Sequence, residues 1–295
     1  MIPDGHGPTY DVGREPLRSP LQRAASLPIL SRLRVDLVEM AREQAEYVEL
    51  LRAIIRRDLS LRYRNAVMGF GWAAFTPLLQ VVIFTLVFTR VAPLDVGMPY
   101  PLYAYAGLLA WTMSASAIRA AATSLTSNPD LVTKVYFPRE VLPFSAVLVA
   151  LVDFAVASAV MVVLMAYYGV GVGWSLLLLP LVVLVHVAFT AGVALLVAMG
   201  HLFYADVKYI FELVLIVWMF ASSVLYPLDR VGGAFGAVMR LNPMTPIIDA
   251  YRDVVLRNTL PEPGPFVAVA AVSVLALAVG WLVFHRAEFR FAEEI

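Results

Sequence analysis

The chain has two lysines, Lys134 and Lys208, and neither is placed to hold a nucleotide phosphate. A phosphate-binding loop needs Gly-rich backbone amides followed by a lysine, in the pattern G-x-x-x-x-G-K-[ST], which neither lysine completes. There is no cysteine, so thiol nucleophiles, disulfides and cysteine-ligated metals are excluded. We therefore expect no catalytic residue, no cofactor and no metal in this chain. If its process consumes ATP, then ATP and Mg²⁺ bind to a separate polypeptide.

One group of carboxylates, Asp249, Asp253 and Glu262, raises the alternative of an integral-membrane enzyme such as a glycosyltransferase. Such an enzyme needs carboxylates or histidines clustered on one membrane face. Arg252 and Arg257 interleave with these acids in the pattern of a charged helix face. We therefore disfavour an enzyme and expect Arg252 to belong to this charged face.

Four ionisable residues lie inside apolar segments, where an uncompensated charge is costly: Arg119, Asp153, His186 and Glu212. Asp153 lies about ten residues, or roughly 15 Å of helix, inside its segment, and His186 is similarly deep. Arg119 and Glu212 lie near segment ends and can extend their head groups toward the membrane surface. For Asp153 and His186 we favour a structural hydrogen bond between helices over a proton relay, since no chain of such groups is present.

These residues must be positioned by helices within a membrane. Of the 295 residues, 61% are hydrophobic and 15% charged, against roughly 45–50% and 25% in soluble chains. The formal net charge of zero gives no reason to expect nucleic acid. A bilayer core needs about 20 consecutive apolar residues per helix. Six stretches qualify, which predicts an all-α, polytopic membrane protein: 67–91, 102–125, 143–168, 174–200, 209–226 and 265–285.

The orientation follows from arginine and lysine, which are enriched in cytoplasmic segments. Residues 1–66 contain eleven arginines, whereas the connections at 92–101 and 169–173 contain no basic residue. We therefore place both termini in the cytoplasm and the chain in the inner membrane of a bacterium. The connection at 227–264 would then be outside, although it carries four arginines, contrary to the rule.

Two segments outside the six stretches have helical patterns. Residues 47–66 predict an amphipathic helix with a basic face, lying in the membrane interface or packed on a partner protein. Residues 227–264 contain short patterns at 233–241 and 245–256, separated by Asn242-Pro243. We expect re-entrant helices there, because irregular backbone at membrane depth must line protein or water; a soluble loop is the alternative. Residues 1–46 predict a disordered cytoplasmic tail, 67–285 the transmembrane domain and 286–295 a second tail.

Several motifs, in order, are similar to one family. They are RYR at 62–64, VMGFGWAAFTPL at 67–78, YFPREVLP at 136–143, LYPL at 225–228, LNPMTP at 241–246 and DAYR at 249–252. From about residue 50 to its end, the chain resembles permeases of ABC type-2 transporters that export polysaccharides such as O-antigen, capsule and teichoic acid. One departure is Ala205, which stands where the family often carries an arginine before Asp206.

The resemblance implies a homodimeric permease that moves a lipid-linked polysaccharide outward and docks two nucleotide-binding ABC ATPase subunits. It makes the segment 128–142 the candidate docking site. This segment offers aromatic and charged side chains, which are typical anchors of a packed protein–protein interface. An ordinary solvated loop is the alternative. The docking residues would be Asp130, Lys134, Tyr136, Phe137, Arg139, Glu140, Asp206 and Lys208. Asn242 and Pro243 would belong to an outer gate.

Aromatic side chains are the candidate lining of the polysaccharide pathway, because sugars pack their C–H faces on aromatic rings. The candidates are Phe75, Phe84, Phe88, Trp111, Trp218 and Phe220. An aromatic belt at the membrane surface is the competing interpretation of such rings. An ABC type-2 exporter of a drug or small lipid is the alternative function, and composition alone would also allow a purely structural membrane protein.

Overall fold

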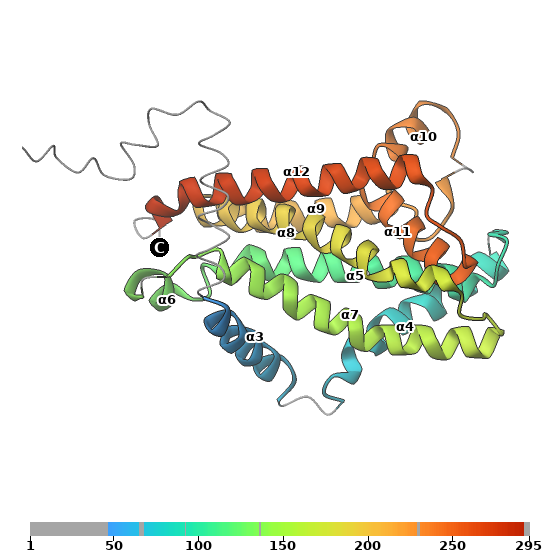
Figure 1. Cartoon of the computed structure of the whole chain (residues 1–295), viewed down its shortest axis with the longest axis horizontal. Helices are drawn as coiled ribbons and strands as arrows, with labels where there is room; N and C mark the ends of the chain where they lie inside the picture. Colours follow the sequence, from blue (N-terminus) through green and yellow to red (C-terminus); the bar gives the residue numbers. More distant parts are fainter. Residues whose placement is uncertain (1–46, 65–67, 92, 136, 229–230, 292–295) are drawn as a thin grey trace, which may run out of the picture. The chain divides into compact units, whose positions relative to one another are not determined.

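The computed structural model describes residues 47–64, 68–91, 93–135, 137–228 and 231–291, which lie in one unit of the chain, Glu43–Ile295. The tail expected at 1–46 and the last residues of the second tail, 292–295, lie outside the described residues. Within the described ranges every regular element is a helix, which confirms the all-α prediction (Figure 1). The elements are α3 (Val48–Tyr63), α4 (Gly71–Leu86) with η1 (Val87–Val91), α5 (Tyr100–Ser124), α6 (Pro129–Lys134), α7 (Val141–Tyr168), η2 (Trp174–Leu178) with α8 (Leu179–Phe203), α9 (Asp206–Phe220), α10 (Gly233–Arg240), α11 (Met244–Arg252) with η4 (Asp253–Arg257), and α12 (Pro263–Ala287) with η5 (Glu288–Arg290).

Each of the six predicted apolar stretches contains a helix among its described residues, although the fifth, predicted at 209–226, is helical only as far as Phe220. Four helices are long and apolar enough to cross a membrane. These four are Gly71–Val91, Val141–Tyr168, Trp174–Phe203 and Pro263–Arg290. The other two differ for separate reasons. The 25 residues of α5 include several serines, threonines and tyrosines, whereas α9 is apolar but has only 15 residues. The chain is therefore a helical membrane protein, and six spans stay a prediction.

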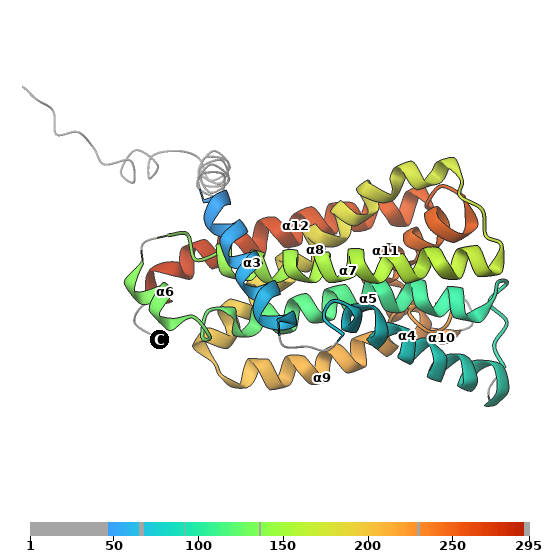
Figure 2. The ribbon, with the colours of Figure 1, turned by 90° about the horizontal axis from the view of Figure 1, so that it is seen from below.

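The core is built around α5, which packs against α7 and α8, while α12 packs along α8 (Figure 2). Small residues make these close approaches possible. A Cβ atom on Gly192 of α8 would lie 2.4 Å from the carbonyl carbon of Ala276, and one on Gly280 of α12 would lie 2.5 Å from the Gly192 oxygen. Both distances are far inside van der Waals contact, so the crossing of α8 and α12 requires glycine on both helices.

The helices α4 and α9 contribute little to this core. Leu215 is the one buried residue of α9, and α4 buries only Pro77 and Val81. Large side chains such as Leu79, Ile83 and Leu213 are about half exposed or more. Apolar surface on this scale faces lipid or another protein subunit rather than water.

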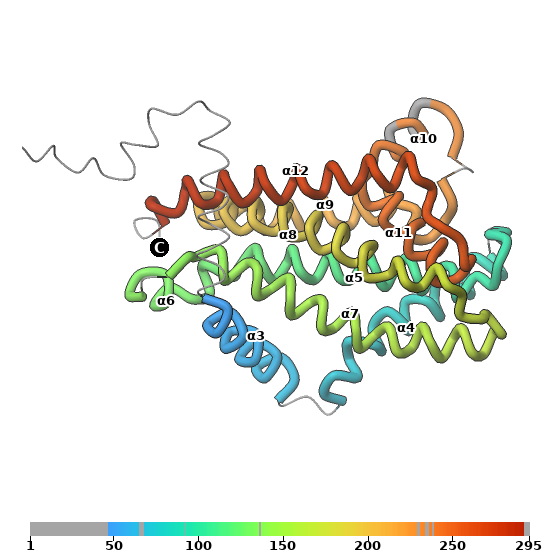
Figure 3. The backbone as a smooth tube through the Cα atoms, in the orientation of Figure 1, coloured from blue at the N-terminus to red at the C-terminus, as the bar shows by residue number. Residues whose placement is uncertain are grey.

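The short helices lie at opposite ends of the bundle (Figure 3). At one end, α6 lies near the C-terminal end of α12; at the other, α10 and α11 lie near the beginning of α12. The patterns predicted at 233–241 and 245–256 match α10 and α11 with η4. Asn242 and Pro243 separate them, as expected from a proline that cannot continue a helix from the preceding residue.

Candidate functional site

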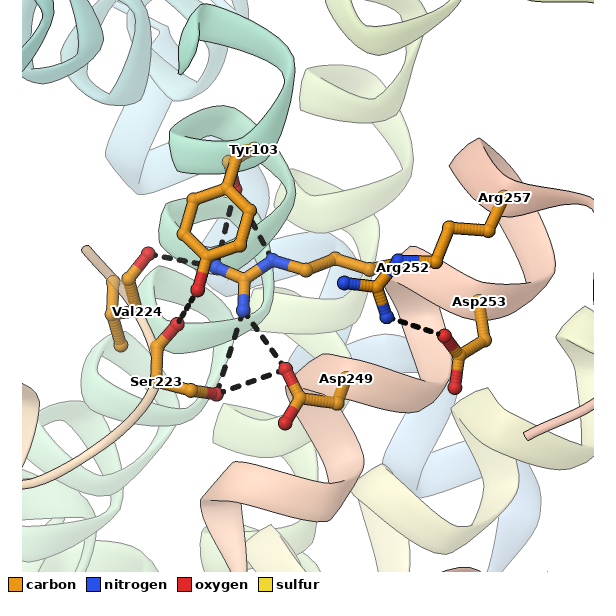
Figure 4. Close-up of polar contacts among 7 residues, drawn as sticks. All are labelled: Tyr103, Ser223, Val224, Asp249, Arg252, Asp253 and Arg257. Carbon is orange, nitrogen blue, oxygen red and sulfur yellow. Dashed lines mark hydrogen bonds and ion pairs between the residues drawn. The ribbon is translucent and has the colours of Figure 1, made fainter. Parts of the chain in front are cut away.

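Arg252 of α11 is fully buried, with 0% of its surface exposed. Its guanidinium donates to the Tyr103 carbonyl oxygen at 3.2 and 3.3 Å and to the Val224 carbonyl oxygen at 2.9 Å (Figure 4). It also contacts the Asp249 carboxylate at 2.9 Å and Ser223 Oγ at 3.5 Å. Arg252 thus pairs with an acid of the predicted charged face, but its side chain points into the core, because α11 packs against α5.

Two residues of α5 make room for the Arg252 guanidinium or contact it directly. The guanidinium carbon lies 3.5 Å from the centroid of the Tyr103 ring, a cation–π contact. A Cβ atom on Gly107 would lie 2.4 Å from the Val224 oxygen and 2.6 Å from Arg252 Nη2, so only glycine fits there.

Burial raises the pKa of the Asp249 carboxyl, and the nearby positive charge of Arg252 offsets part of this effect. We call Tyr103, Ser223, Val224, Asp249 and Arg252 the Arg252 cluster.

The predicted gate residue Asn242 also joins separate elements. Its Oδ1 accepts hydrogen bonds from Trp218 Nε1 at 2.8 Å and from the Met244 amide at 3.0 Å. Its Nδ2 donates to the Ala221 carbonyl at 2.8 Å and to Ser222 Oγ at 2.7 Å. Asn242 thus connects the end of α9 to the junction of α10 and α11, and Pro243 directly precedes the first residue of α11.

Beside these contacts, a cavity of about 730 Å³ lies between α10, α11 and the first turns of α12. Its walls include Tyr103 and Phe266 as aromatic rings and Arg240, Asp249 and Arg257 as charged groups. Asn242 and Pro243 also line it. A pocket of this size with aromatic walls and a few polar groups is typical of small-ligand sites.

The predicted pathway aromatics fall into three sets. Trp111 and Trp218 meet edge to face, with ring centroids 5.8 Å apart. Phe84 and Phe88 stack at 6.4 Å, and Phe88 continues to Tyr100 at 5.4 Å. Phe75 and Phe220 are exposed. The aromatic residues therefore cover both the buried core and the open faces of α4 and α9.

Asp153 binds the end of α3. The Arg62 guanidinium forms an ion pair with it, and the Tyr63 hydroxyl donates to it at 2.6 Å. Burial, with the hydrogen bond to Asp153, raises the pKa of Tyr63 to about 12, so this hydroxyl stays protonated. Arg62 belongs to the helix predicted to have a basic face, and its ion pair with Asp153 connects α3 to α7.

His186 lies in the core between α5 and α11. Its Nε2 is 2.7 Å from Ser114 Oγ, and its Nδ1 is 3.1 Å from the Tyr251 hydroxyl. Both contacts join different helices, which agrees with a structural role. The other two polar residues, Arg119 and Glu212, line one small pocket together with Lys208.

The predicted docking residues divide into an exposed and a buried set. Asp130 and Lys134 of α6 form an ion pair of 2.6 Å, with 81% and 72% of their side chains exposed. Asp206 is exposed and Lys208 half-buried. Phe137 is buried, and Tyr136 lies outside the described residues.

Arg139 and Glu140, by contrast, point into the protein. The Arg139 guanidinium donates to the Val132 carbonyl at 3.2 and 3.3 Å and to the Glu288 carbonyl at 2.9 Å. Glu140 Oε1 is 2.9 Å from His285 Nδ1. His285 and Glu288, in the predicted last stretch and tail, were not among the candidate residues, and no local sequence signal links them to a loop about 145 positions earlier.

The all-helical fold with apolar outer faces defines an integral membrane protein built from several long helices. The chain belongs to the ABC-2 type transporter family, whose model matches residues 49–256. It is 33% identical over 261 residues to an O-antigen export system permease protein of Myxococcus xanthus, covering 88% of this chain and all of that relative. Two proteins of Klebsiella pneumoniae with the same description are 27% and 26% identical, covering 83% of this chain and 94% of each relative.

Proposed function

We propose that this chain is the permease subunit of an ATP-driven ABC exporter that moves a lipid-linked polysaccharide across the cytoplasmic membrane. The observation that carries this proposal is the similarity to O-antigen export permeases over the full length of the Myxococcus protein. Aromatic side chains along α4, α5 and α9 suit a sugar polymer, since their faces pack on sugar rings while few fixed charges oppose its movement. The cargo would be O-antigen-like, capsular or teichoic-acid-like.

The proposed arrangement in the membrane has six spans with both termini in the cytoplasm of a bacterium. Four are the long apolar helices. Contacts of α5 with α7 and α8 support counting α5 as a span, because it lies among helices that cross the membrane. The exposed apolar faces of α4 and α9 supply the surface for a homodimer. In this arrangement α10 and α11 are re-entrant helices at the outer mouth, and Asn242 and Pro243 belong to the gate.

ATP and Mg²⁺ would bind to a separate ABC ATPase that docks at the cytoplasmic end. The exposed side of α6, with Asp130, Lys134 and Val135, is the proposed contact surface. Asp206 and Lys208 would flank it. Phe137, Arg139 and Glu140 would support the loop from beneath, since their side chains are directed into the protein.

The cargo is tested by deleting the gene in its own host. We expect loss of surface polysaccharide and accumulation of lipid-linked polymer inside the cell, both restored by the wild-type gene. Intact surface polysaccharide, combined with ATPase stimulation by small amphiphiles, would instead identify an exporter of a drug or small lipid.

Docking is tested by Lys134→Glu, which reverses the charge of an exposed side chain. We expect less ATPase to co-purify with this variant, while the permease itself is inserted normally. Glu262→Lys, an exposed charge reversal at the other end of the bundle, is the matched control. Equal co-purification of the ATPase with both variants would rule out this docking surface.

A further inference from the structure

Glu140, His285 and Glu288 meet where the loop before α7 packs against the end of α12. His285 Nδ1 lies 2.9 Å from Glu140 Oε1 and 3.6 Å from Glu288 Oε2. One possible ligand atom from each residue lies within 4.8 Å of the other two. In the part of the chain that the structure describes, this is the one group of three histidine or carboxylate side chains with such spacing.

An unsatisfied atom points to a missing partner in this group. Glu140 is 1% exposed, and among the described residues its buried Oε2 has no hydrogen-bond partner. A buried carboxylate oxygen without a partner is costly, and such atoms are uncommon in folded proteins. His285 and Glu288 keep 30% and 14% of their side chains exposed, which leaves a route from solvent to the group.

The surroundings hold these side chains in place. The Arg139 amide donates to Glu288 Oε1 at 2.9 Å, and the Arg139 guanidinium donates to the Glu288 carbonyl at 2.9 Å. The second oxygen of Glu288 is thereby directed toward His285. Ligand carboxylates at metal sites are commonly oriented by such outer hydrogen bonds.

We propose that Glu140, His285 and Glu288 bind a divalent transition-metal ion, for which zinc fits best. One imidazole and two carboxylates are borderline ligands that suit zinc. Glu140 Oε2 or a water molecule completes a four-coordinate site. The ion would fasten the proposed docking loop to the end of α12.

The competing explanation is an ion-pair group in which a protonated His285 lies between the two carboxylates. His285→Lys distinguishes the two, because lysine keeps a positive charge but offers a poor zinc ligand at neutral pH. Glu288→Gln removes one ligand charge from a mostly buried position. Glu262→Gln, at an exposed carboxylate directly before α12 and so at the opposite end of that helix from His285, is the matched control.

The experiment uses the full chain with its ATPase in lipid nanodiscs, stripped with EDTA and then titrated with Zn²⁺. Thermal unfolding is followed by tryptophan fluorescence, and Co²⁺ is added separately to detect visible absorption bands of a bound ion. We expect Zn²⁺ to raise the unfolding temperature of wild type and Glu262→Gln, because an ion that binds only the folded state stabilises it. Both His285→Lys and Glu288→Gln should lose this shift and the Co²⁺ bands.

The proposal is overturned if Zn²⁺ leaves the wild-type unfolding temperature unchanged, or if the shift persists in both site variants. If Zn²⁺ does not change the unfolding temperature of the wild type, and His285→Lys unfolds at the same temperature as the wild type, the three residues form an ion-pair group instead. Metal binding is measured without transport, so failure of the proposed polysaccharide export would not alter this result.

Discussion

The Arg252 cluster provides the sharpest test of the fold, through the substitution Arg252→Gln. Glutamine keeps part of the side-chain length but loses the charge and most of the donors. A single guanidinium donates hydrogen bonds to three acceptors, and the substitution removes these donors: the acceptors are the Tyr103 carbonyl, the Val224 carbonyl and the Asp249 carboxylate. We therefore expect α11 to loosen from α5 and from the segment after α9.

The expected loss in the free energy of unfolding follows from the burial of Arg252. Removing one partner of a buried ion pair costs about 3–5 kcal/mol. Asp249 keeps 42% of its side chain exposed, so water can solvate it partly, and we expect the low end, about 3 kcal/mol. For chains of comparable length each kcal/mol shifts the unfolding temperature by roughly 2–4 °C, which predicts a loss of about 6–12 °C.

The matched control is Arg257→Gln, five positions further along the same segment. Arg257 is paired with Asp253 at 2.7 Å, but its side chain is 44% exposed, and exposed pairs contribute about 0–1 kcal/mol. Thermal unfolding of both purified variants, followed by tryptophan fluorescence, measures the difference. Equal unfolding temperatures for Arg252→Gln and Arg257→Gln would refute the reasoning from burial.

Three other substitutions test separate contacts. Gly192→Leu places a side chain where even a Cβ meets the α12 backbone, so we expect little folded protein by size-exclusion chromatography; a normal yield would contradict the close crossing. Asp153→Leu removes the carboxylate that binds Arg62; we expect faster proteolysis within α3, and an unchanged digestion pattern would oppose this. Asn242→Ala leaves Trp218 Nε1 without its acceptor, so we expect an altered tryptophan spectrum and a loss of about 1–3 kcal/mol; an unchanged spectrum and stability would count against this bond.

Local patterns in the sequence predict most of the helices. An apolar stretch of sufficient length forms a helix in lipid because its own backbone must satisfy every hydrogen bond, and each of the six predicted stretches contains a helix. The break between α10 and α11 follows from Asn242-Pro243 in the same local way. The existence of most helices can therefore be predicted from local patterns, whereas their ends are less certain, as α9 ends at Phe220 and not at the predicted residue 226.

The contacts of the charged residues cannot be predicted from local sequence patterns in this way. Arg252 alternates with acids in the sequence, yet its acceptor on Tyr103 lies 149 positions away. Arg139 also resembles an interface residue, although its partner Glu288 is 149 positions away. Whether a charge faces solvent, a subunit or the core depends on helix packing, which periodicity within one segment does not specify.

The packing of α12 links the proposed docking loop to the cavity beside the Arg252 cluster. Its C-terminal end is bound to the proposed docking loop through Arg139 and Glu288, and its first turns, with Phe266, line the cavity beside the Arg252 cluster. A helix of this length extends about 37 Å at 1.5 Å per residue, and the crossing at Gly192 holds its middle closely against α8. A movement of the proposed docking loop that preserves the Arg139 bonds must therefore displace the end of α12. Because a packed helix moves largely as one body, the same displacement would change the wall of the cavity beside the Arg252 cluster.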